Sequence, residues 1–269
     1  MIRSDLHNHT YFSFDSQASM SDMIEAARKK GLSTMAFTDH HDIDFNYEGI
    51  SGELDVLNYI KAIDEIRTGL TDDFNLLTGI EFGIEKHLHE PLRQLARRHA
   101  FDFIISSTHF AKGKDPYEPT YFDGLTRNEG YFSIFEDTLF NVQHFDDFDT
   151  LGHLDYVIRY WRRDDHKKYT YADFSDVLDA ILTTLIRKDK ALEVNTSGYV
   201  YKLDQPHPSY EVLKRYHQLG GELLTIGSDA HRPENVATSF DLVEKHLKDI
   251  GFKSYTQFQK RVPKQIGFN

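Results

Sequence analysis

The sequence predicts an α/β fold in which seven parallel strands, each followed by a helix, close into a barrel. Short apolar runs alternate with segments of helical spacing, which implies βαβ units and a parallel sheet. The runs are apolar nearly throughout, as expected of strands that are buried on both faces. Each run is followed by His, Asp, Glu or Asn, and the carboxyl ends of barrel strands share the face where active sites lie.

The predicted strands are short, and they cover residues 2–7, 32–38, 75–80, 102–107, 148–152, 190–194 and 222–226. The predicted helices after the first cover residues 56–67, 91–99, 128–141, 171–187, 209–219, 239–249 and 254–261. Ser19 or Ser21 can cap the first helix, and Gly31 ends it. We expect loops at residues 42–54 and 111–126, and the second is long enough to form a lid or a substrate wall.

Composition and charge exclude several classes of protein. The chain has no linker or composition shift, so residues 1–269 are expected to form one domain. The net charge of −12 opposes a broad nucleic-acid surface, although bound metals could still create a pocket for a small phosphorylated substrate. The absence of cysteine excludes disulfides, thiolate metal sites and thiol nucleophiles.

The sequence shows no apolar run of about 18 residues and no signal peptide. We therefore expect a cytoplasmic protein that contacts no membrane. The sequence does not specify an oligomeric state.

His7 and His9 stand two residues apart at the end of the first predicted strand. Side chains alternate along a strand, so both imidazoles would point to one side and could hold a metal ion. One such pair is a weak signal, since a polar residue after a strand is often a helix cap. Ligand-type residues at six of the seven strand ends are much harder to explain by chance. The side chains expected to converge are His7, His9, His40, Glu81, His109, His153, Asp229 and His231.

Imidazole and carboxylate ligands without thiolates suit zinc, manganese or iron, and the residue types do not choose among them. More ligands are present than one ion needs. The sequence therefore predicts a site with several metal ions at the carboxyl ends of the strands.

With these residues assembled, the sequence resembles the PHP family (polymerase and histidinol phosphatase), and within it the histidinol-phosphate phosphatases. The matching segments are residues 5–10, 38–40, 81, 107–109, 152–155, 193–196 and 227–233. Gly-His-Leu-Asp at 152–155 and Gly-Ser-Asp-Ala-His-Arg-Pro at 227–233 favour the histidinol-phosphatase branch over the polymerase-associated domains. The resemblance implies a distorted (β/α)7 barrel that holds three divalent metal ions.

The resemblance also implies which residues hold each ion. The implied ligands are His7, His9, Glu81 and Asp229 for the first ion, Glu81, His109 and His153 for the second, and Asp15, His40 and His231 for the third. Glu81 would bridge the first two ions. Asp15 stands where many family members use histidine, and its carboxylate is a competent oxygen ligand.

The implied reaction is hydrolysis of the phosphate monoester L-histidinol phosphate to L-histidinol and phosphate, a step of histidine biosynthesis. We hypothesise that a hydroxide shared by two metal ions attacks phosphorus in line. Asp229 would orient that water or accept its proton. Two rival functions remain open, namely a PHP phosphoesterase acting on nucleotides or short oligonucleotides, and a PHP module that binds metal or partner proteins without catalysis.

Several residues close to the metal motifs are candidates for the remaining roles. Arg159 and Arg232 are candidates for a phosphate clamp. Asp42 and Asp155 are candidate catalytic acids, and His41 is a candidate for the acid or for substrate binding. The general acid stays open among these three residues.

The imidazole and amine of the substrate would need carboxylates or aromatic rings. The 111–126 loop could supply Asp115, Tyr117 and Tyr121. Asp5 is expected to orient one of the ligand imidazoles from behind. Seven further histidines are expected to be ordinary surface or packing residues, namely His87, His89, His99, His144, His166, His207 and His217.

Overall fold

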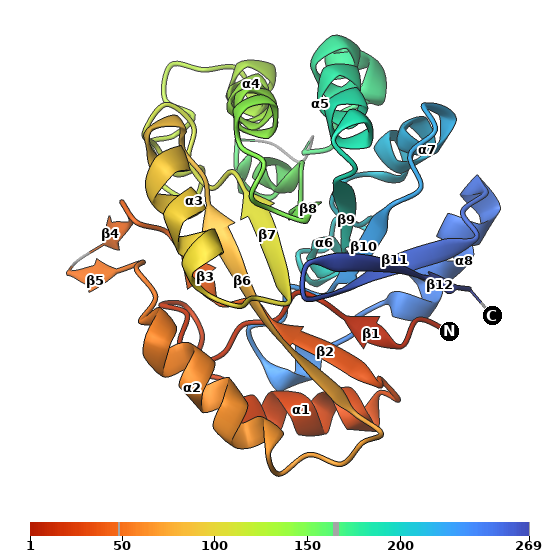
Figure 1. The fold of residues 1–269 in the computed structure, drawn as a ribbon. Helices are drawn as coiled ribbons and strands as arrows, with labels where there is room; N and C mark the ends of the chain where they lie inside the picture. Colours follow the sequence, from red (N-terminus) through yellow and green to blue (C-terminus); the bar gives the residue numbers. More distant parts are fainter. Residues whose placement is uncertain (48, 164–166, 269) are drawn as a thin grey trace.

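The computed structural model describes residues 1–47, 49–163 and 167–268 (Figure 1). Within these residues seven parallel strands form one continuous path, in the order β1-β2-β6-β7-β8-β9-β10. Their bounds are β1 Ser4–Asp5, β2 Thr34–Phe37, β6 Asn75–Gly83, β7 Phe103–Ser107, β8 Thr150–Leu151, β9 Ala191–Asn195 and β10 Leu224–Gly227.

The two ends of this path meet and nearly close the barrel. The Leu6 amide donates to the Ile226 carbonyl at 2.9 Å, and the Asp229 amide donates to the His7 carbonyl at 2.8 Å. The predicted seven-stranded parallel barrel is therefore confirmed. We call the end where the strands begin the floor of the barrel, and the end where they finish its mouth.

Helices surround the barrel (Figure 1). They are α1 Met20–Lys29, α2 Val56–Arg67, α3 His89–Arg98, α4 Arg127–His144, α5 Ser175–Arg187, the short α6 Ser197–Val200, α7 Tyr210–Gln218 and α8 Phe240–Ile250. Single turns of 3-10 helix are η1 Lys86–Leu88, η2 Tyr156–Tyr160, η3 Tyr171–Phe174 and η4 Pro233–Asn235. Ser19 caps α1, because its hydroxyl accepts the Asp22 amide proton. No helix among the described residues is long and apolar enough to span a bilayer.

The last predicted helix is wrong. Residues 254–261 instead supply β11 Ser254–Gln259, which pairs antiparallel with β12 Val262–Gly267. Tyr255 and Phe258 are three residues apart, a spacing that also fits a helix. Lys260 and Arg261, however, both adopt positive φ, the backbone of a tight two-residue hairpin turn.

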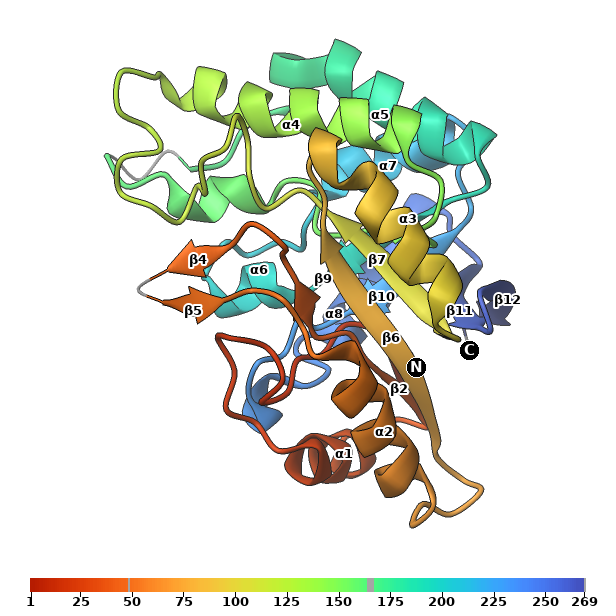
Figure 2. The ribbon, with the colours of Figure 1, turned by 60° about the vertical axis from the view of Figure 1, so that its left-hand side comes forward.

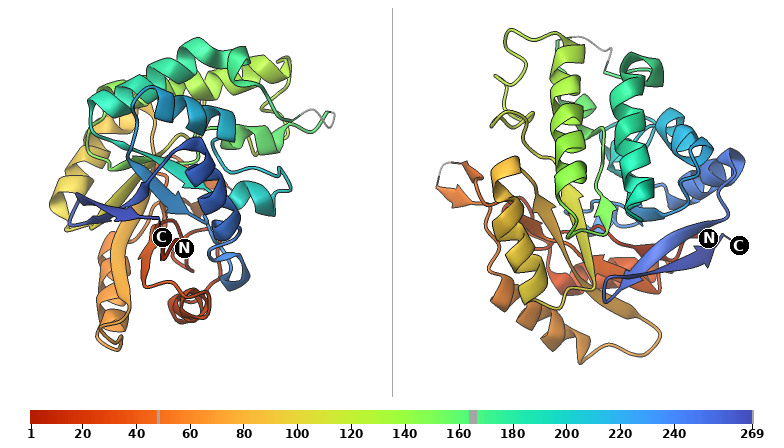
Figure 3. Two further views of the ribbon diagram at one scale, coloured as in Figure 1. Left: turned by 90° about the vertical axis from the view of Figure 1, so that its right-hand side faces the viewer. Right: turned by 45° about the horizontal axis from the view of Figure 1, so that its top comes forward.

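The expected loop at 42–54 contains extended structure, and one more short strand directly precedes it. β3 His40–His41 pairs with β6, and β4 Asn46–Tyr47 forms a small ribbon with β5 Ile50–Ser51. Figure 2 shows this ribbon and α6 toward the mouth, with β11 and β12 at the opposite end. The two chain ends lie side by side near β12 (Figure 3).

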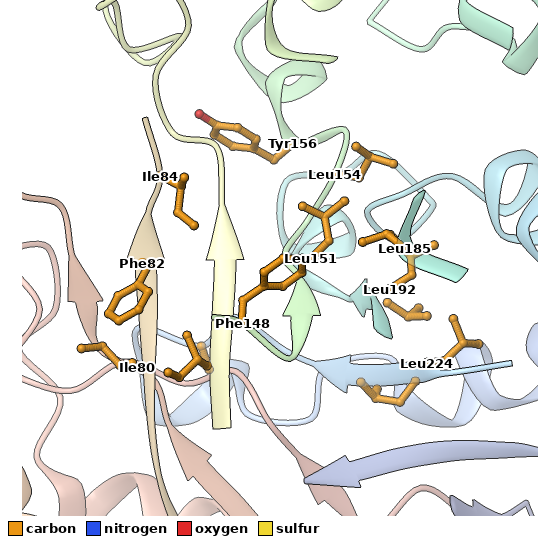
Figure 4. Close-up of a cluster of buried hydrophobic side chains, with 14 of the residues drawn as sticks. Ile80, Phe82, Ile84, Phe148, Leu151, Leu154, Tyr156, Leu185, Leu192 and Leu224 are labelled. Carbon is orange, nitrogen blue, oxygen red and sulfur yellow. The ribbon is translucent and has the colours of Figure 1, made fainter. Parts of the chain in front are cut away.

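Most of the apolar core lies between the barrel and its helices. Ile80, Phe82 and Ile84 alternate along β6 and its continuation, and they pack with side chains such as Phe148 and Leu185 (Figure 4). A second, smaller cluster fills the floor, and it consists of Leu6, Ala36, Leu77, Phe103, Ile105, Ala191 and Phe258. Phe258 comes from the β11–β12 hairpin, and its ring stacks on Phe103 at 5.4 Å. The hairpin therefore closes the floor, and the mouth is left for the functional groups.

Candidate metal centre

Glu81 lies at the centre of the mouth and is completely buried. β6 continues past Ile80, the predicted strand end, so Glu81 is held within the strand rather than after it. Its Oε2 lies 3.2 Å from His7 Nε2, 3.5 Å from His9 Nε2 and 2.8 Å from His40 Nδ1. One carboxylate oxygen therefore faces imidazoles from two different motifs.

The other oxygen of Glu81 faces the opposite side of the mouth. Its Oε1 lies 2.8 Å from His153 Nε2 and 3.3 Å from His109 Nε2. The Ser107 hydroxyl donates to the same oxygen at 2.6 Å. Glu81 thus has the geometry of a carboxylate that can bridge two ions.

Asp229 completes the first of these groups. Its Oδ1 lies 3.3 Å from His9 Nε2 and 3.7 Å from His7 Nε2. The residue follows β10 and adopts a positive φ of 54°, an uncommon backbone for a residue other than glycine. The hydrogen bond from the Asp229 backbone amide to the His7 carbonyl holds this conformation across the seam between β1 and β10.

Asp15 lies at a third corner of the mouth. Its Oδ2 is 3.1 Å from His231 Nε2 and 3.7 Å from His40 Nε2. The His9 ring connects this corner to the centre, since it stacks on the His231 ring at 4.0 Å. The structure therefore brings every predicted ligand to the mouth, including the aspartate that departs from the family pattern.

Several ligand imidazoles are oriented from behind by a hydrogen bond on the second ring nitrogen. His7 Nδ1 lies 2.6 Å from Glu193 Oε1, and His109 Nδ1 lies 2.7 Å from Asp42 Oδ1. A carboxylate only accepts, so each Nδ1 carries a proton, and each Nε2 is the ring atom left to bind a metal ion at the mouth. Sequence reasoning gave Glu193 no role, although it stands two residues before Asn195 and so faces the barrel interior.

The predicted role of Asp5 is wrong. Its Oδ2 accepts from the Ser228 hydroxyl at 2.5 Å and the Ala237 amide at 3.0 Å, and its Oδ1 accepts from the Ser228 amide at 2.9 Å. Its contact with His7 is to the backbone amide, at 3.4 Å. Asp5 therefore fastens the seam between β1 and β10, and Glu193 orients the His7 ring.

The mouth contains buried polar atoms that have no hydrogen-bond partner. They are His7 Nε2, His9 Nε2, His40 Nδ1, Asp42 Oδ2, Glu81 Oε2 and His231 Nε2. Buried polar atoms are nearly always paired, so six unpaired atoms facing one another indicate a site built to hold cations. Sets of three, such as His7, His9 and Glu81, bring their ligand atoms within 4.8 Å of one another. The donor set fits zinc, manganese or iron.

The electrostatics of the metal-free site support the same conclusion. Burial disfavours charge on Glu81, but His7, His40 and His109 outweigh it and hold the pKa of Glu81 well below its usual range. Burial likewise opposes charge on His109, but Asp42 and Glu81 raise its pKa to about 10. His109 therefore holds a proton in the absence of metal, and a metal ion that binds this ring must displace that proton.

Two glycines make room for these contacts. A Cβ atom on Gly227 would lie 2.4 Å from the His7 Cβ and 2.5 Å from Glu193 Oε1. A Cβ atom on Gly83 would lie 1.7 Å from Asp42 Oδ1. Each glycine thus lets an orienting carboxylate approach its imidazole.

Two of the other candidate residues, His41 and Asp155, form their hydrogen bonds with groups other than the predicted ligands. His41 accepts the Leu54 amide at 3.1 Å through Nδ1, and burial lowers its pKa. Both Asp155 oxygens are occupied, because Oδ1 lies 2.6 Å from Nδ1 of the fully buried His207 and Oδ2 accepts from Tyr169 and Ser209. Neither His41 nor Asp155 contacts a predicted ligand through these bonds.

The two candidate arginines differ in setting. The Arg159 guanidinium lies over the rings of Tyr156, Tyr160 and Tyr201 at 4.5–5.1 Å. Arg232 is exposed and lines a hollow that also includes Asp15 and His231. Among the histidines expected to be ordinary, His166 lies outside the described residues.

Comparisons with known proteins agree with this geometry. The PHP domain family model matches residues 5–197. A Clostridium acetobutylicum protein named "Probable histidinol-phosphatase" is 30% identical over 97% of this chain and 98% of its own length. The histidinol-phosphatase of Lactococcus lactis is 29% identical over 96% of this chain and 95% of its own.

A solved structure extends the likeness to three dimensions. The crystal structure of histidinol phosphate phosphatase from Lactococcus lactis, complexed with zinc, L-histidinol and phosphate, superposes with a TM-score of 0.90. It is 27% identical and covers 97% of this chain and 98% of that chain. From the family match and the full-length relatives, this chain belongs to the PHP domain family.

Proposed function

We propose that this protein is a metal-dependent histidinol-phosphatase, which hydrolyses L-histidinol phosphate to L-histidinol and phosphate. The observation that carries the proposal is the buried set of ligands around Glu81, in a fold that matches a relative bound to zinc, L-histidinol and phosphate. As a step of histidine biosynthesis, the reaction is expected in the cytoplasm. The partner is a small phosphate monoester rather than a nucleic acid.

We further propose that three divalent ions bind at the mouth. Glu81 bridges the His7–His9–Asp229 group to the His109–His153 group. Asp15, His40 and His231 form the third group. Such ions, when bound, neutralise phosphoryl oxygens and lower the pKa of bound water.

Asp229 is the carboxylate that we assign to orienting the attacking water. Burial opposes its charge, but His7 outweighs that penalty and keeps the pKa of Asp229 well below its usual range. Its Oδ1 faces the ligand imidazoles, while its Oδ2 is 3.3 Å from the Ser197 hydroxyl. The Asn195 amide oxygen accepts from that hydroxyl at 2.6 Å and so fixes Ser197.

Arg159 is the stronger candidate for binding the phosphate. Its Nε is buried and has no hydrogen-bond partner, which leaves a donor available for a ligand. Tyr156 beneath it lies 4.9 Å from the His153 ring and donates its hydroxyl to the His109 carbonyl. Arg159 is thereby held beside the second group of ligands, whereas Arg232 is exposed beside the third.

Asp115 is the residue that we assign to the cationic amine of the substrate. It is half-buried, its Oδ1 accepts the Tyr117 amide, and burial raises its pKa while the nearby His109 opposes that shift. Tyr121 is a weaker candidate, since its hydroxyl already donates to the Gly130 carbonyl.

For the general acid, the geometry favours Asp42 over Asp155. Asp42 Oδ1 orients His109, and its Oδ2 is buried without a partner 3.5 Å from His40 Nδ1. Both oxygens of Asp155 are used by His207, Tyr169 and Ser209. Asp42 therefore has an oxygen available to a ligand at the mouth, whereas Asp155 fixes the loop around His207.

A direct comparison of substrates tests the proposed function. Metal-loaded protein should turn over L-histidinol phosphate with a higher kcat/KM than nucleoside monophosphates or a short oligonucleotide. Faster turnover of the nucleotides would show that the protein is instead a PHP phosphoesterase that acts on nucleotides. Bound metal without turnover of any of these substrates would favour a binding module.

A further inference from the structure

His9 is oriented differently from His7 and His109, because a serine rather than a carboxylate holds its second nitrogen. His9 Nδ1 lies 3.0 Å from Ser13 Oγ, and both residues are buried. A hydroxyl can donate or accept, so this contact alone leaves the His9 tautomer undecided. The other neighbours of Ser13 decide it.

Ser13 Oγ has two further partners at hydrogen-bond distance. The His40 backbone amide lies 3.0 Å away, and it can only donate. Asp39 Oδ1 lies 2.7 Å away. That oxygen already accepts the Thr10 amide at 2.6 Å and the Ser13 amide at 3.0 Å, so the proton between it and Ser13 belongs to the serine.

The number of protons shared among these groups then determines the tautomer of the His9 ring. Ser13 has one hydroxyl proton, which it donates to Asp39, and two lone pairs. One lone pair accepts from the His40 amide, so the other must accept from His9 Nδ1–H. A neutral His9 therefore carries its proton on Nδ1 and turns an unprotonated Nε2 toward Glu81 and Asp229, at 3.5 and 3.3 Å.

We propose that Ser13 and Asp39 are positioning residues that act as a relay to lock the metal-binding tautomer of His9. Asp39 polarises and orients the Ser13 hydroxyl, and the hydroxyl in turn fixes the ring. The same hydroxyl holds the His40 backbone, and the His9 and His40 rings lie 4.2 Å apart. The relay thus aligns ligands from the first and second motifs through one hydroxyl group.

The relay makes the loop after His9 part of the metal site. Asp39 accepts hydrogen bonds from the backbone amides and the hydroxyls of both Thr10 and Ser13. This folds the loop against the end of β2, and Asp15 two residues later is thereby brought to the third corner. The inference concerns metal binding, so it holds or fails whichever phosphate monoester the protein hydrolyses.

A measurement on the wild-type protein tests the tautomer directly. Long-range ¹H–¹⁵N correlation spectra of the zinc-loaded protein should show a His9 ring protonated at Nδ1 and bound to metal through Nε2, assigned by loss of the signal in His9→Ala. A His9 ring bound through Nδ1, or protonated at Nε2, overturns the proposal.

Variants then test the relay. Ser13→Ala should weaken the binding of at least one zinc ion by about 10–100-fold in chelator competition, the usual effect of removing an outer partner of a ligand. Ser13→Thr keeps the hydroxyl and should restore both zinc affinity and the Nδ1–H signal. Ser133→Ala is the matched control, because it removes a buried serine hydroxyl that donates to the Glu129 carbonyl at 3.1 Å within α4.

Each outcome decides the proposal. Zinc affinity and ring signal unchanged in a folded Ser13→Ala protein would overturn it. If Ser13→Ala does not fold, Asp39→Asn takes its place: the neutral amide polarises the Ser13 hydroxyl less, so zinc affinity should fall while the retained acceptor keeps the Nδ1–H signal. Unchanged zinc affinity in a folded Asp39→Asn protein, or loss of the Nδ1–H signal in a folded Ser13→Thr protein, would also overturn the proposal.

Discussion

The mouth and the floor of this barrel are built from the same strands and follow opposite physical rules. β7 sends Phe103 and Ile105 into the floor cluster and Ser107 into the mouth. β9 likewise supplies Ala191 below and Glu193 above. A shift of two or four residues along one inward face therefore changes an apolar contact into a polar support for a ligand.

Polar groups of the hairpin that closes the floor have partners. Arg261 at the tip of the hairpin donates to Asp149, and Asp102 accepts from the Lys260 and Arg261 amides. The mouth instead concentrates buried atoms that lack partners, with Glu81 among them. This difference indicates that the floor contributes to the stability of the fold. The unpaired polar atoms of the mouth instead cost free energy until a cation binds to them.

The largest effect is expected at the centre of the mouth. Glu81→Gln keeps the shape of the side chain but removes the charge that can bridge two ions. Metal content should fall, and kcat/KM for L-histidinol phosphate should drop by more than the about 100-fold typical of outer partners. Metal analysis and steady-state kinetics measure both. Wild-type values for both would show that the mouth is not the metal centre.

The floor counterpart is Phe258→Ala. Removing this ring leaves a cavity against Phe103 and should cost about 3–5 kcal/mol of unfolding free energy, measured by urea denaturation. Zinc content and kcat/KM of the folded fraction should stay unchanged. A loss of zinc affinity in this variant would mean that the two ends of the barrel are coupled.

The pH dependence of stability should separate the two ends. His109 has a pKa of about 10 in the metal-free folded protein, against about 6.5 in an unfolded chain. Its raised pKa stabilises the metal-free fold fully below about pH 6.5, and that contribution is lost as the pH rises toward 10. Thermal unfolding should show this decline without zinc and not with zinc. A decline that persists with zinc would place its cause outside the mouth.

The smallest effect is expected at the rim of the mouth. Asp115→Asn should raise KM for L-histidinol phosphate by up to about fivefold, because a half-exposed ion pair contributes at most about 1 kcal/mol. KM for a phosphate monoester without an amine should not change. Equal increases for both substrates would remove Asp115 from amine recognition.

The barrel and the candidate ligands could be predicted because their signals are local. Apolar runs mark the strands, and His, Asp or Glu at a strand end can be identified without knowledge of its neighbours. Glu81 is predicted in this way, whereas Asp15, which follows no predicted strand, is predicted only from the family resemblance. The parallel order of the strands then brings their ends to one face.

The orienting groups could not be predicted because their roles depend on register. Asp5 and Glu193 are both buried carboxylates near ligands, and only the closure of β1 on β10 decides which one reaches the His7 ring. Asp155 was placed near the chemistry because it follows His153, but its carboxylate turns to His207. The helix expected at 254–261 is wrong for a similar reason: the spacing of Tyr255 and Phe258 fits one face of a helix, but in the fold the two side chains join different clusters, with only Phe258 in the floor.

The seam between β1 and β10 also sets the time at which the protein can acquire its metals. His7 and His231 are separated by 224 positions, so ribosomal synthesis at roughly 5–20 residues per second needs roughly 10–45 s to pass from one to the other. Until β10 emerges, Asp5 has no Ser228 to hold and the first group lacks Asp229. Loading of the first and third groups therefore waits until nearly the whole chain has been made, and each new chain carries an incomplete chelator until then.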